Sequence, residues 1–154
     1  MARSRVHEGD WFVVPLRDGR FAAGLAARVS SSGILFGYFF GPAQVEPPLK
    51  EDVVALKPDE AVLVGQFGHL GLSNGTWRLL GSLPHWDRAQ WPAGPLIRYE
   101  ELTGRTYRVF YDDLDPSVIV SEERVPPGPA EQGPPDGLMG AGYVERVLTK
   151  ALAD

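Results

Sequence analysis

Glycine and proline interrupt this chain so often that they restrict it to short elements of secondary structure. The 154 residues include 18 Gly and 14 Pro, scattered along the sequence. Proline breaks helix interiors and glycine weakens them, whereas both suit the turns that join short strands. The pattern predicts a mainly β fold: a small, strongly bent sheet or an SH3-like, partly open barrel with extra strands and one C-terminal helix.

Local signals indicate where several strands begin and end. Asp18-Gly19 lies between two apolar runs, an arrangement typical of a β-hairpin because glycine adopts a positive φ at little cost. Residues 34–40 are almost continuously apolar, which predicts a strand that is buried on both faces and that Gly41-Pro42 ends. Asn74-Gly75 predicts a second hairpin between two further strands.

The C-terminal part of the chain has a different pattern. Five of the twelve residues 125–136 are proline, which indicates a linker or a polyproline II arm. After Asp136, a favourable N-cap, apolar residues recur at helical spacing. We therefore expect a single domain, residues 1–154, made of a β core (6–124), a Pro-rich arm (125–136) and a C-terminal helix (137–152).

Composition excludes several kinds of site. The chain has no Cys, which excludes disulfides, a thiolate nucleophile, Cys-ligated zinc and iron–sulfur clusters. Its three His argue against a His-rich metal site, so we expect neither a metal nor another cofactor. The N-terminus lacks the apolar region of a secretory signal, and no apolar run approaches the roughly 20 residues of a membrane-spanning helix. We expect a cytoplasmic protein without a membrane partner.

Charge favours a protein partner over nucleic acid. The net charge of −5 opposes binding to nucleic acid, which depends on Lys and Arg that neutralise phosphates. Seven acidic residues lie between positions 109 and 136 with a single Arg, so acid gathers in the C-terminal third. Such a surface suits a basic protein partner, although a solvated acidic turn would give the same pattern. The candidate partner-binding residues in this stretch are Asp112, Asp113, Asp115, Glu122 and Glu123.

A second candidate surface lies in an irregular, aromatic loop. Trp86, Asp87 and Trp91 lie among prolines there, and tryptophan is a favoured interface anchor because it buries a large area. The same rings would equally cover one end of the core. His85 and Asp87 form a close pair of a histidine and an acid, but no nucleophile motif accompanies them. A loop histidine beside a surface aspartate explains the pair without catalysis, and we expect no enzyme.

Several short motifs follow one another in a recognisable order: Gly9-Asp10-Trp11, Pro15-Leu16-Arg17-Asp18-Gly19, Gly37-Tyr38-Phe39-Phe40-Gly41-Pro42, Trp86-Asp87, Trp91-Pro92 and Gly140-Ala141-Gly142. This order resembles the immunity protein 26 family of bacterial polymorphic toxin systems, over roughly residues 6–152. The resemblance implies a small cytoplasmic protein that binds a cognate toxin and blocks it. It implies no catalytic residues, no cofactor and no particular oligomeric state.

The leading hypothesis is therefore toxin neutralisation by direct, stoichiometric protein–protein binding. The alternative is a small β-barrel binding module for nucleic acid or a modified peptide. The negative net charge argues against nucleic acid as its ligand. A third hypothesis is a hydrolase that uses His85 and Asp87. These hypotheses differ in what they require of the fold and of the residues named above.

Overall fold

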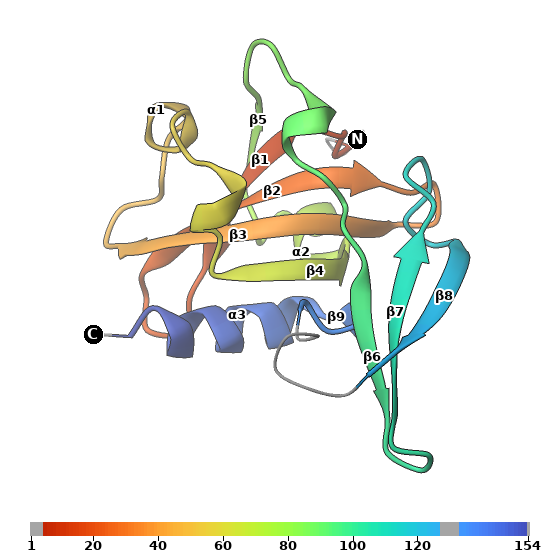
Figure 1. The fold of residues 1–154 in the computed structure, drawn as a ribbon. Helices are drawn as coiled ribbons and strands as arrows, with labels where there is room; N and C mark the ends of the chain where they lie inside the picture. The colour runs from red at the N-terminus through yellow and green to blue at the C-terminus, as the bar shows by residue number, and fades with distance from the viewer. Residues whose placement is uncertain (1–4, 127–132, 154) are drawn as a thin grey trace.

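The computed structural model describes residues 5–126 and 133–153 of the chain. Within this part, the strands form two open sheets, and neither sheet closes into a barrel (Figure 1). The predicted mainly β fold with one C-terminal helix is confirmed. None of the helices in these residues combines the length and the hydropathy of a membrane-spanning segment.

The first sheet has the strand order β5-β1-β2-β3-β4-β9. Its strands are β1 (Asp10–Pro15), β2 (Phe21–Val29), β3 (Ile34–Gln44), β4 (Leu63–Gly68), β5 (Leu79–Ser82) and β9 (Leu138–Met139). The second sheet has the order β6-β7-β8 and consists of β6 (Leu96–Glu100), β7 (Arg105–Tyr111) and β8 (Ile119–Val125). The helices are α1 (Lys50–Val53), α2 (Leu70–Ser73) and α3 (Ala141–Ala151), with 3-10 turns η1 (Pro58–Glu60) and η2 (Arg88–Gln90).

The Asp18-Gly19 signal forms the predicted hairpin between β1 and β2. The two strands are antiparallel, with Val14 opposite Ala22, and Gly19 has a φ of +87°. Residues with a side chain rarely adopt that conformation, whereas glycine does so at little cost. The turn therefore sets the register of the first two strands, and the register decides which side chains enter the core.

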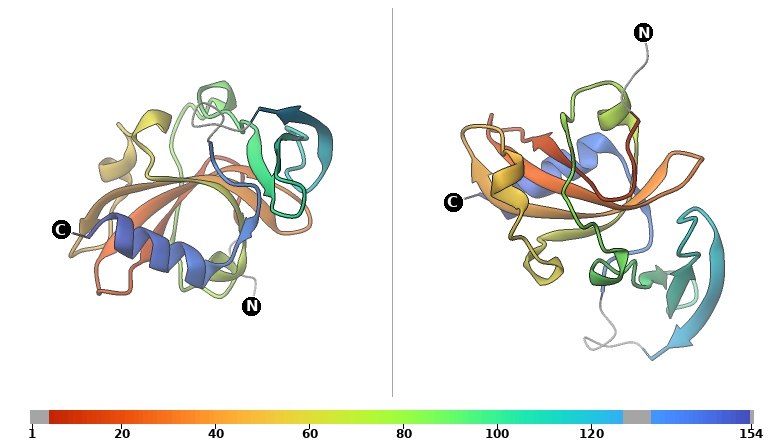
Figure 2. Two further views of the ribbon diagram at one scale, coloured as in Figure 1. Left: turned by 60° about the horizontal axis from the view of Figure 1, so that its bottom comes forward. Right: turned by 90° about the horizontal axis from the view of Figure 1, so that it is seen from above.

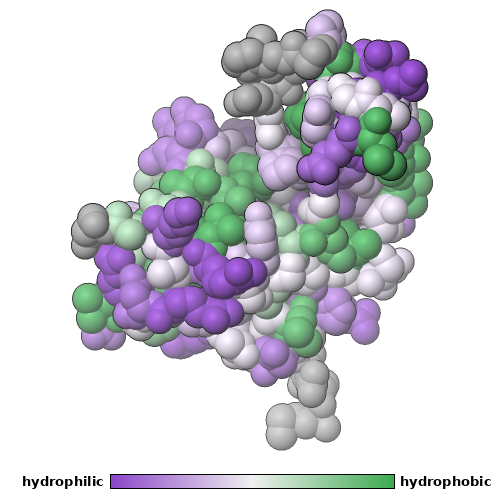
Figure 3. Space-filling view, turned by 90° about the horizontal axis from the view of Figure 1, so that it is seen from below, coloured by the Kyte–Doolittle hydropathy of each residue, from purple (hydrophilic) through white to green (hydrophobic). Residues whose placement is uncertain are grey.

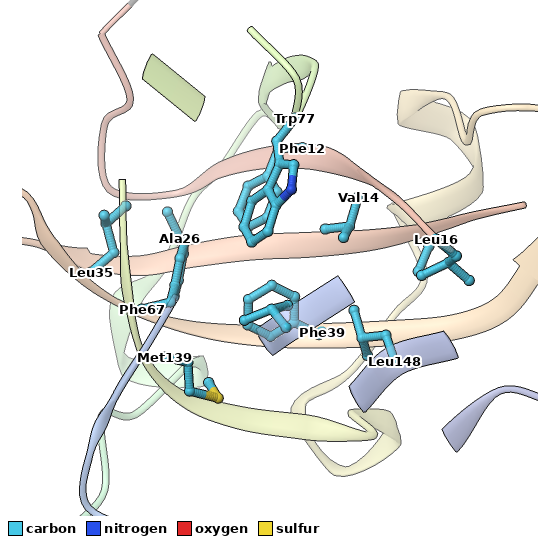
Figure 4. Close-up of a cluster of buried hydrophobic side chains, with 12 residues drawn as sticks. Phe12, Val14, Leu16, Ala26, Leu35, Phe39, Phe67, Trp77, Met139 and Leu148 are labelled. Atoms are coloured by element: carbon cyan, nitrogen blue, oxygen red, sulfur yellow. The ribbon is translucent and has the colours of Figure 1, made fainter. Parts of the chain in front are cut away.

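The first sheet buries side chains on both faces. On one face, the rings of Phe12 and Trp77 stack with centroids 5.5 Å apart, and Leu148 of α3 packs into the same cluster (Figure 4). The opposite face carries a second cluster that includes Trp11 and, from the second sheet, Leu96. Burial on both faces of β3 confirms the prediction from its continuous apolar run.

Gly24 allows the ring of Phe12 to lie directly against the backbone of β2. A Cβ atom at residue 24 would lie 2.4 Å from Cε1 of Phe12 and 3.1 Å from Cδ1 of Phe39. Folded proteins do not tolerate contacts this short, so any side chain at this position displaces an aromatic ring. Glycine is required here by close packing.

Helix α3 covers the face of the first sheet that carries Trp77. Val144 and Leu148 of the helix are fully buried. Nε1 of Trp77 also donates a hydrogen bond to Oε2 of Glu145 at 2.9 Å, so the helix is fixed by a polar contact as well as by packing. Hydrophilic residues gather on the outward side of the helix (Figure 3). This two-sided pattern is the amphipathic helix that the sequence predicted.

The helix begins later than the sequence predicted. We expected it over residues 137–152 with Asp136 as N-cap, but it starts at Ala141 with Gly140 as N-cap. Residues 138–139 form β9 instead, which pairs in parallel with β4 and buries Met139. Tertiary pairing and burial here override the local helical pattern. The carboxylate of Asp136 accepts a hydrogen bond from the hydroxyl of Tyr111 at 2.5 Å.

Two other predicted boundaries are wrong. Strand β3 runs through Gly41-Pro42, which lies in a β-bulge. There the step from Phe21 to Ala23 in β2 pairs with the longer step from Gln44 to Phe40 in β3. A bulge interrupts the ladder, so the missing N–H of proline is tolerated there. Asn74-Gly75 ends α2 instead of forming a hairpin, with Asn74 as C-cap and Gly75 at a φ of +82°. Strands β4 and β5 lie on opposite sides of β1–β3 in the first sheet.

The second sheet stands beside the first and is held by the chain that returns from it (Figure 2). The amide of Ile97 in β6 donates to the carbonyl of Pro134 at 2.8 Å, and the amide of Asp136 donates to the carbonyl of Ile97 at 2.7 Å. Residues 134–136 therefore cover the outer edge of β6. The predicted Pro-rich arm 125–136 falls in part on residues 127–132, which lie outside the described residues.

Candidate functional site

The acidic turn between β7 and β8 lies at the rim of the second sheet. The amide of Asp112 donates to the carbonyl of Val118 at 2.8 Å, which closes the loop. The carboxylate of Asp115 accepts hydrogen bonds from the hydroxyl of Ser117 at 2.5 Å and from its amide at 3.0 Å. These bonds lower the pKa of Asp115 from its usual value because they favour the charged form. The turn is thus fixed by its own side chains.

Asp113 faces the first sheet. Its carboxylate accepts hydrogen bonds from Nε of Arg28 at 2.9 Å and from Nη1 of Arg88 at 2.5 Å. Arg28 is buried in β2, and its Nη1 also donates to the carbonyls of Ala27 at 2.6 Å and Trp91 at 3.1 Å. The hydrogen bond from Arg28 holds the pKa of Asp113 below its usual range. Asp113 therefore links the acidic turn to the first sheet.

Arg88 extends this network to the N-terminal segment. Its Nη2 and Nε donate to the carboxylate of Glu8 at 2.9 and 3.0 Å. Nε1 of Trp86 donates to the same carboxylate at 2.9 Å. Burial alone would raise the pKa of Glu8, but the hydrogen bonds from Arg88 and Trp86 outweigh burial and lower it. The aromatic loop is consequently held in one position by charged partners.

The two glutamates of β8 are paired across the second sheet. Nη1 of Arg98 donates to Glu122 at 2.6 Å, and Arg108 pairs with Glu123. Exposed pairs of this kind add little stability, but they fix where the charges lie. Residues 96–125 still contain seven carboxylates against four arginines, a net charge of −3. The surface predicted from sequence is therefore an acidic sheet with arginines between its carboxylates.

The two tryptophans of the aromatic loop have different surroundings. Trp91 is 9% exposed and packs edge-on against Tyr38 and Trp11, with ring centroids 5.2 and 5.7 Å apart. It is part of the core. Trp86 is only partly buried, and both rings line a groove of about 540 Å³. Trp86 is the more exposed of the two rings.

Asp87 supports the loop and does not orient His85. Its Oδ1 accepts a hydrogen bond from the amide of Ala89 at 3.0 Å, which caps η2. Among the described residues, no hydrogen bond joins the side chains of His85 and Asp87. The same part of the chain contains no group of three His, Asp or Glu residues that could hold a metal ion. The geometry that the hydrolase hypothesis requires is not formed at this pair.

Arg28 and Glu8 hold the two candidate surfaces in place, and neither is among the residues predicted from sequence. Arg28 does carry a signal, since it is the one charged residue in the apolar run 21–29. A charge in a strand that is buried on both faces needs a partner close by. Glu8 carries no such signal, because its partner Arg88 lies 80 residues away in the chain.

The sequence model of immunity protein 26 matches residues 7–108. The chain belongs to the immunity protein 26 family. The matched segment of this family member includes β1 to β6 and part of β7, while β8 and α3 follow it. No curated protein and no solved structure shows a significant match to the chain.

Proposed function

We propose that this member of the immunity protein 26 family neutralises a cognate bacterial toxin in the cytoplasm by direct, stoichiometric binding. Membership of the family is the observation that carries the proposal. The network of Arg28, Asp113, Arg88 and Glu8 supports it, because it holds the acidic turn and the aromatic loop in place without a partner. A pre-organised surface loses less conformational entropy on binding.

The partner we propose is a basic protein. The chain carries a net charge of −5, and residues 96–125 alone carry −3. Complementary charge speeds the encounter of two proteins and disfavours wrong partners, and its effect weakens as salt screens it. The same negative charge opposes the phosphates of nucleic acid. Toxin binding therefore agrees with the charge, whereas a nucleic-acid binding module does not.

A rescue experiment tests the proposal. The protein is co-expressed in a bacterial host with the toxin domain encoded beside its gene, and growth is scored. We expect growth to be restored and the two proteins to co-purify in equal amounts. Continued growth arrest, with both proteins soluble and eluting separately on size exclusion, would contradict the proposal.

The charge component has its own matched control. Asp112→Asn removes one carboxylate from the acidic turn, and Asp59→Asn removes one from η1 in the first half of the chain, so net charge changes equally. We expect association with the toxin domain to slow with Asp112→Asn and to stay unchanged with Asp59→Asn. Equal association rates for the two variants, or an association rate that does not change with salt concentration, would count against the acidic turn as the contact surface.

A further inference from the structure

The edge strands of the two sheets differ in whether they are protected from pairing with a further strand. An edge strand presents unpaired N–H and C=O groups, and proteins commonly keep such strands short or cover them. In the first sheet, the edge strand β5 has four residues and β9 has two. In the second sheet, residues 134–136 cover β6 through hydrogen bonds to Ile97. Three of the four edge strands are therefore short or covered.

Strand β8 is the exception within the described residues. It has seven residues and pairs only with β7. It lies at the outer rim of the molecule in both views that show it from the side and from above (Figures 1 and 2). A seven-residue edge is long enough to pair with a complete additional strand, since typical strands have about five or six residues.

The pairing pattern shows which backbone groups of β8 point outward. Both backbone groups of Ile97 bond to residues 134–136, so they point away from β7. Arg108, opposite Ile97, must then direct its own backbone groups toward β8, where it lies opposite Glu123. Backbone direction alternates along a strand. Glu122 and Arg124 therefore point their N–H and C=O groups to the open edge.

The side chains along this edge define what would pair with it. Val118, Ile119 and Val120 are 46, 47 and 59% exposed, an apolar run at the start of the strand. Glu122 and Glu123 follow and are paired with Arg98 and Arg108 of the same sheet, which keeps a net charge of −3 over residues 96–125. The edge thus begins apolar and continues along a sheet of net negative charge.

We propose that β8 takes up an extended, basic segment of the toxin as a fourth strand of the second sheet. The inference rests on the proposed function and names the surface and the mode of binding. Main-chain hydrogen bonds supply affinity in such strand addition, and side chains supply selectivity. A second copy of this chain is a poor occupant, because each second sheet carries a net charge of −3 and like charges across paired strands repel. A basic segment meets the same edge with opposite charge.

Two substitutions at one position test the role of the backbone. Arg124→Pro removes the outward N–H, and proline is tolerated on an edge strand when its N–H would face solvent. Arg124→Ala removes the same side chain and keeps the N–H. We expect Arg124→Ala to bind the toxin domain at least as tightly as the wild type, because the surface becomes more acidic. Arg124→Pro should bind at least about tenfold more weakly, since it loses one hydrogen bond and leaves a carbonyl of the partner unpaired.

The outcomes separate this inference from the proposed function. A wild-type protein that does not bind the toxin domain overturns the proposed function itself. A wild type that binds, together with an Arg124→Pro variant of unchanged melting temperature that binds as tightly as Arg124→Ala, overturns strand addition alone. Dimerisation of the free protein that Arg124→Pro abolishes would overturn the choice of the toxin over a second copy.

Hydrogen exchange supplies a second measurement that does not depend on how the proline variant folds. In the wild-type complex, the amides of Glu122 and Arg124 should become protected when the toxin domain binds, because they acquire acceptors. The amide of Glu123 already faces β7 and serves as the internal reference. Unchanged exchange at Glu122 and Arg124 in a complex would overturn the proposal.

Discussion

Replacing Arg28 with alanine removes the buried cation that connects β2 to the acidic turn and the aromatic loop. The guanidinium donates to the carboxylate of Asp113 and to the carbonyls of Ala27, Trp91 and Arg88. The side chain of Asp113 is 58% exposed, so its pairing contributes less than about 1 kcal/mol after solvent screening. The larger loss comes from the carbonyls of Ala27 and Trp91, because a buried polar group without a partner costs about 1–3 kcal/mol. We expect the free energy of unfolding to fall by about 3 kcal/mol.

Urea denaturation measures this loss directly, and a thermal melt should show a midpoint lower by roughly 6–12 °C for a chain of this size. Arg17→Ala is the matched control: Arg17 also bonds a carboxylate on another element, Glu145, but its side chain is 53% exposed. We expect that control to cost less than about 1 kcal/mol. If Arg28→Ala proves no more destabilising than Arg17→Ala, the buried arginine does not hold the two sheets together and the reasoning is refuted.

Two further outcomes are expected. Gly24→Ala should lower the free energy of unfolding by about 2–3 kcal/mol, because its Cβ would lie 2.4 Å from the ring of Phe12. Gly94→Ala is the control: its Cβ would meet nothing within 4 Å, so the free energy of unfolding should change by less than about 0.5 kcal/mol. Equal melting temperatures for the two variants would contradict the packing argument. The pKa values of Asp113 and Glu8 are lower in the folded state than in the unfolded state. Their contribution to the free energy of unfolding is therefore complete above the unfolded-state pKa values of about 4, and it is lost as the pH falls through the folded-state pKa values. Urea midpoints across the acid range should therefore fall less steeply for Asp113→Asn than for the wild type, and parallel curves would show that this carboxylate plays no part.

The parts of the fold that could be predicted from sequence depend on residues that are adjacent in the chain. The Asp18-Gly19 hairpin follows from the freedom of glycine at one turn, and the two-sided burial of β3 follows from one apolar run. Asn74-Gly75 shows the limit of this reasoning, because the same dipeptide that closes hairpins also ends helices. Residues 138–139 were expected in a helix, and only the neighbouring strand β4, far away in the chain, makes them a strand.

The candidate site shows the same division. A count of acidic residues found Asp113, but it did not reveal that Arg28, 85 residues earlier, draws this carboxylate toward the first sheet. The aromatic loop was found through its tryptophans, yet their residue type is the same whether they pack inside or face a partner, and the structure places Trp91 in the core. The position of Glu122 at an open edge depends on strand order, which one-dimensional patterns do not contain.

The place of α3 in the chain has a consequence for biosynthesis. All the strands it covers precede it, so the ribosome completes the sheet before it releases the helix that seals it. Until Val144 and Leu148 emerge, the nascent protein displays the aromatic cluster around Phe12 and Trp77 to the surrounding solution. Exposed aromatic surface of this kind invites chaperones and aggregation alike. Docking of α3 covers this cluster and removes that exposure.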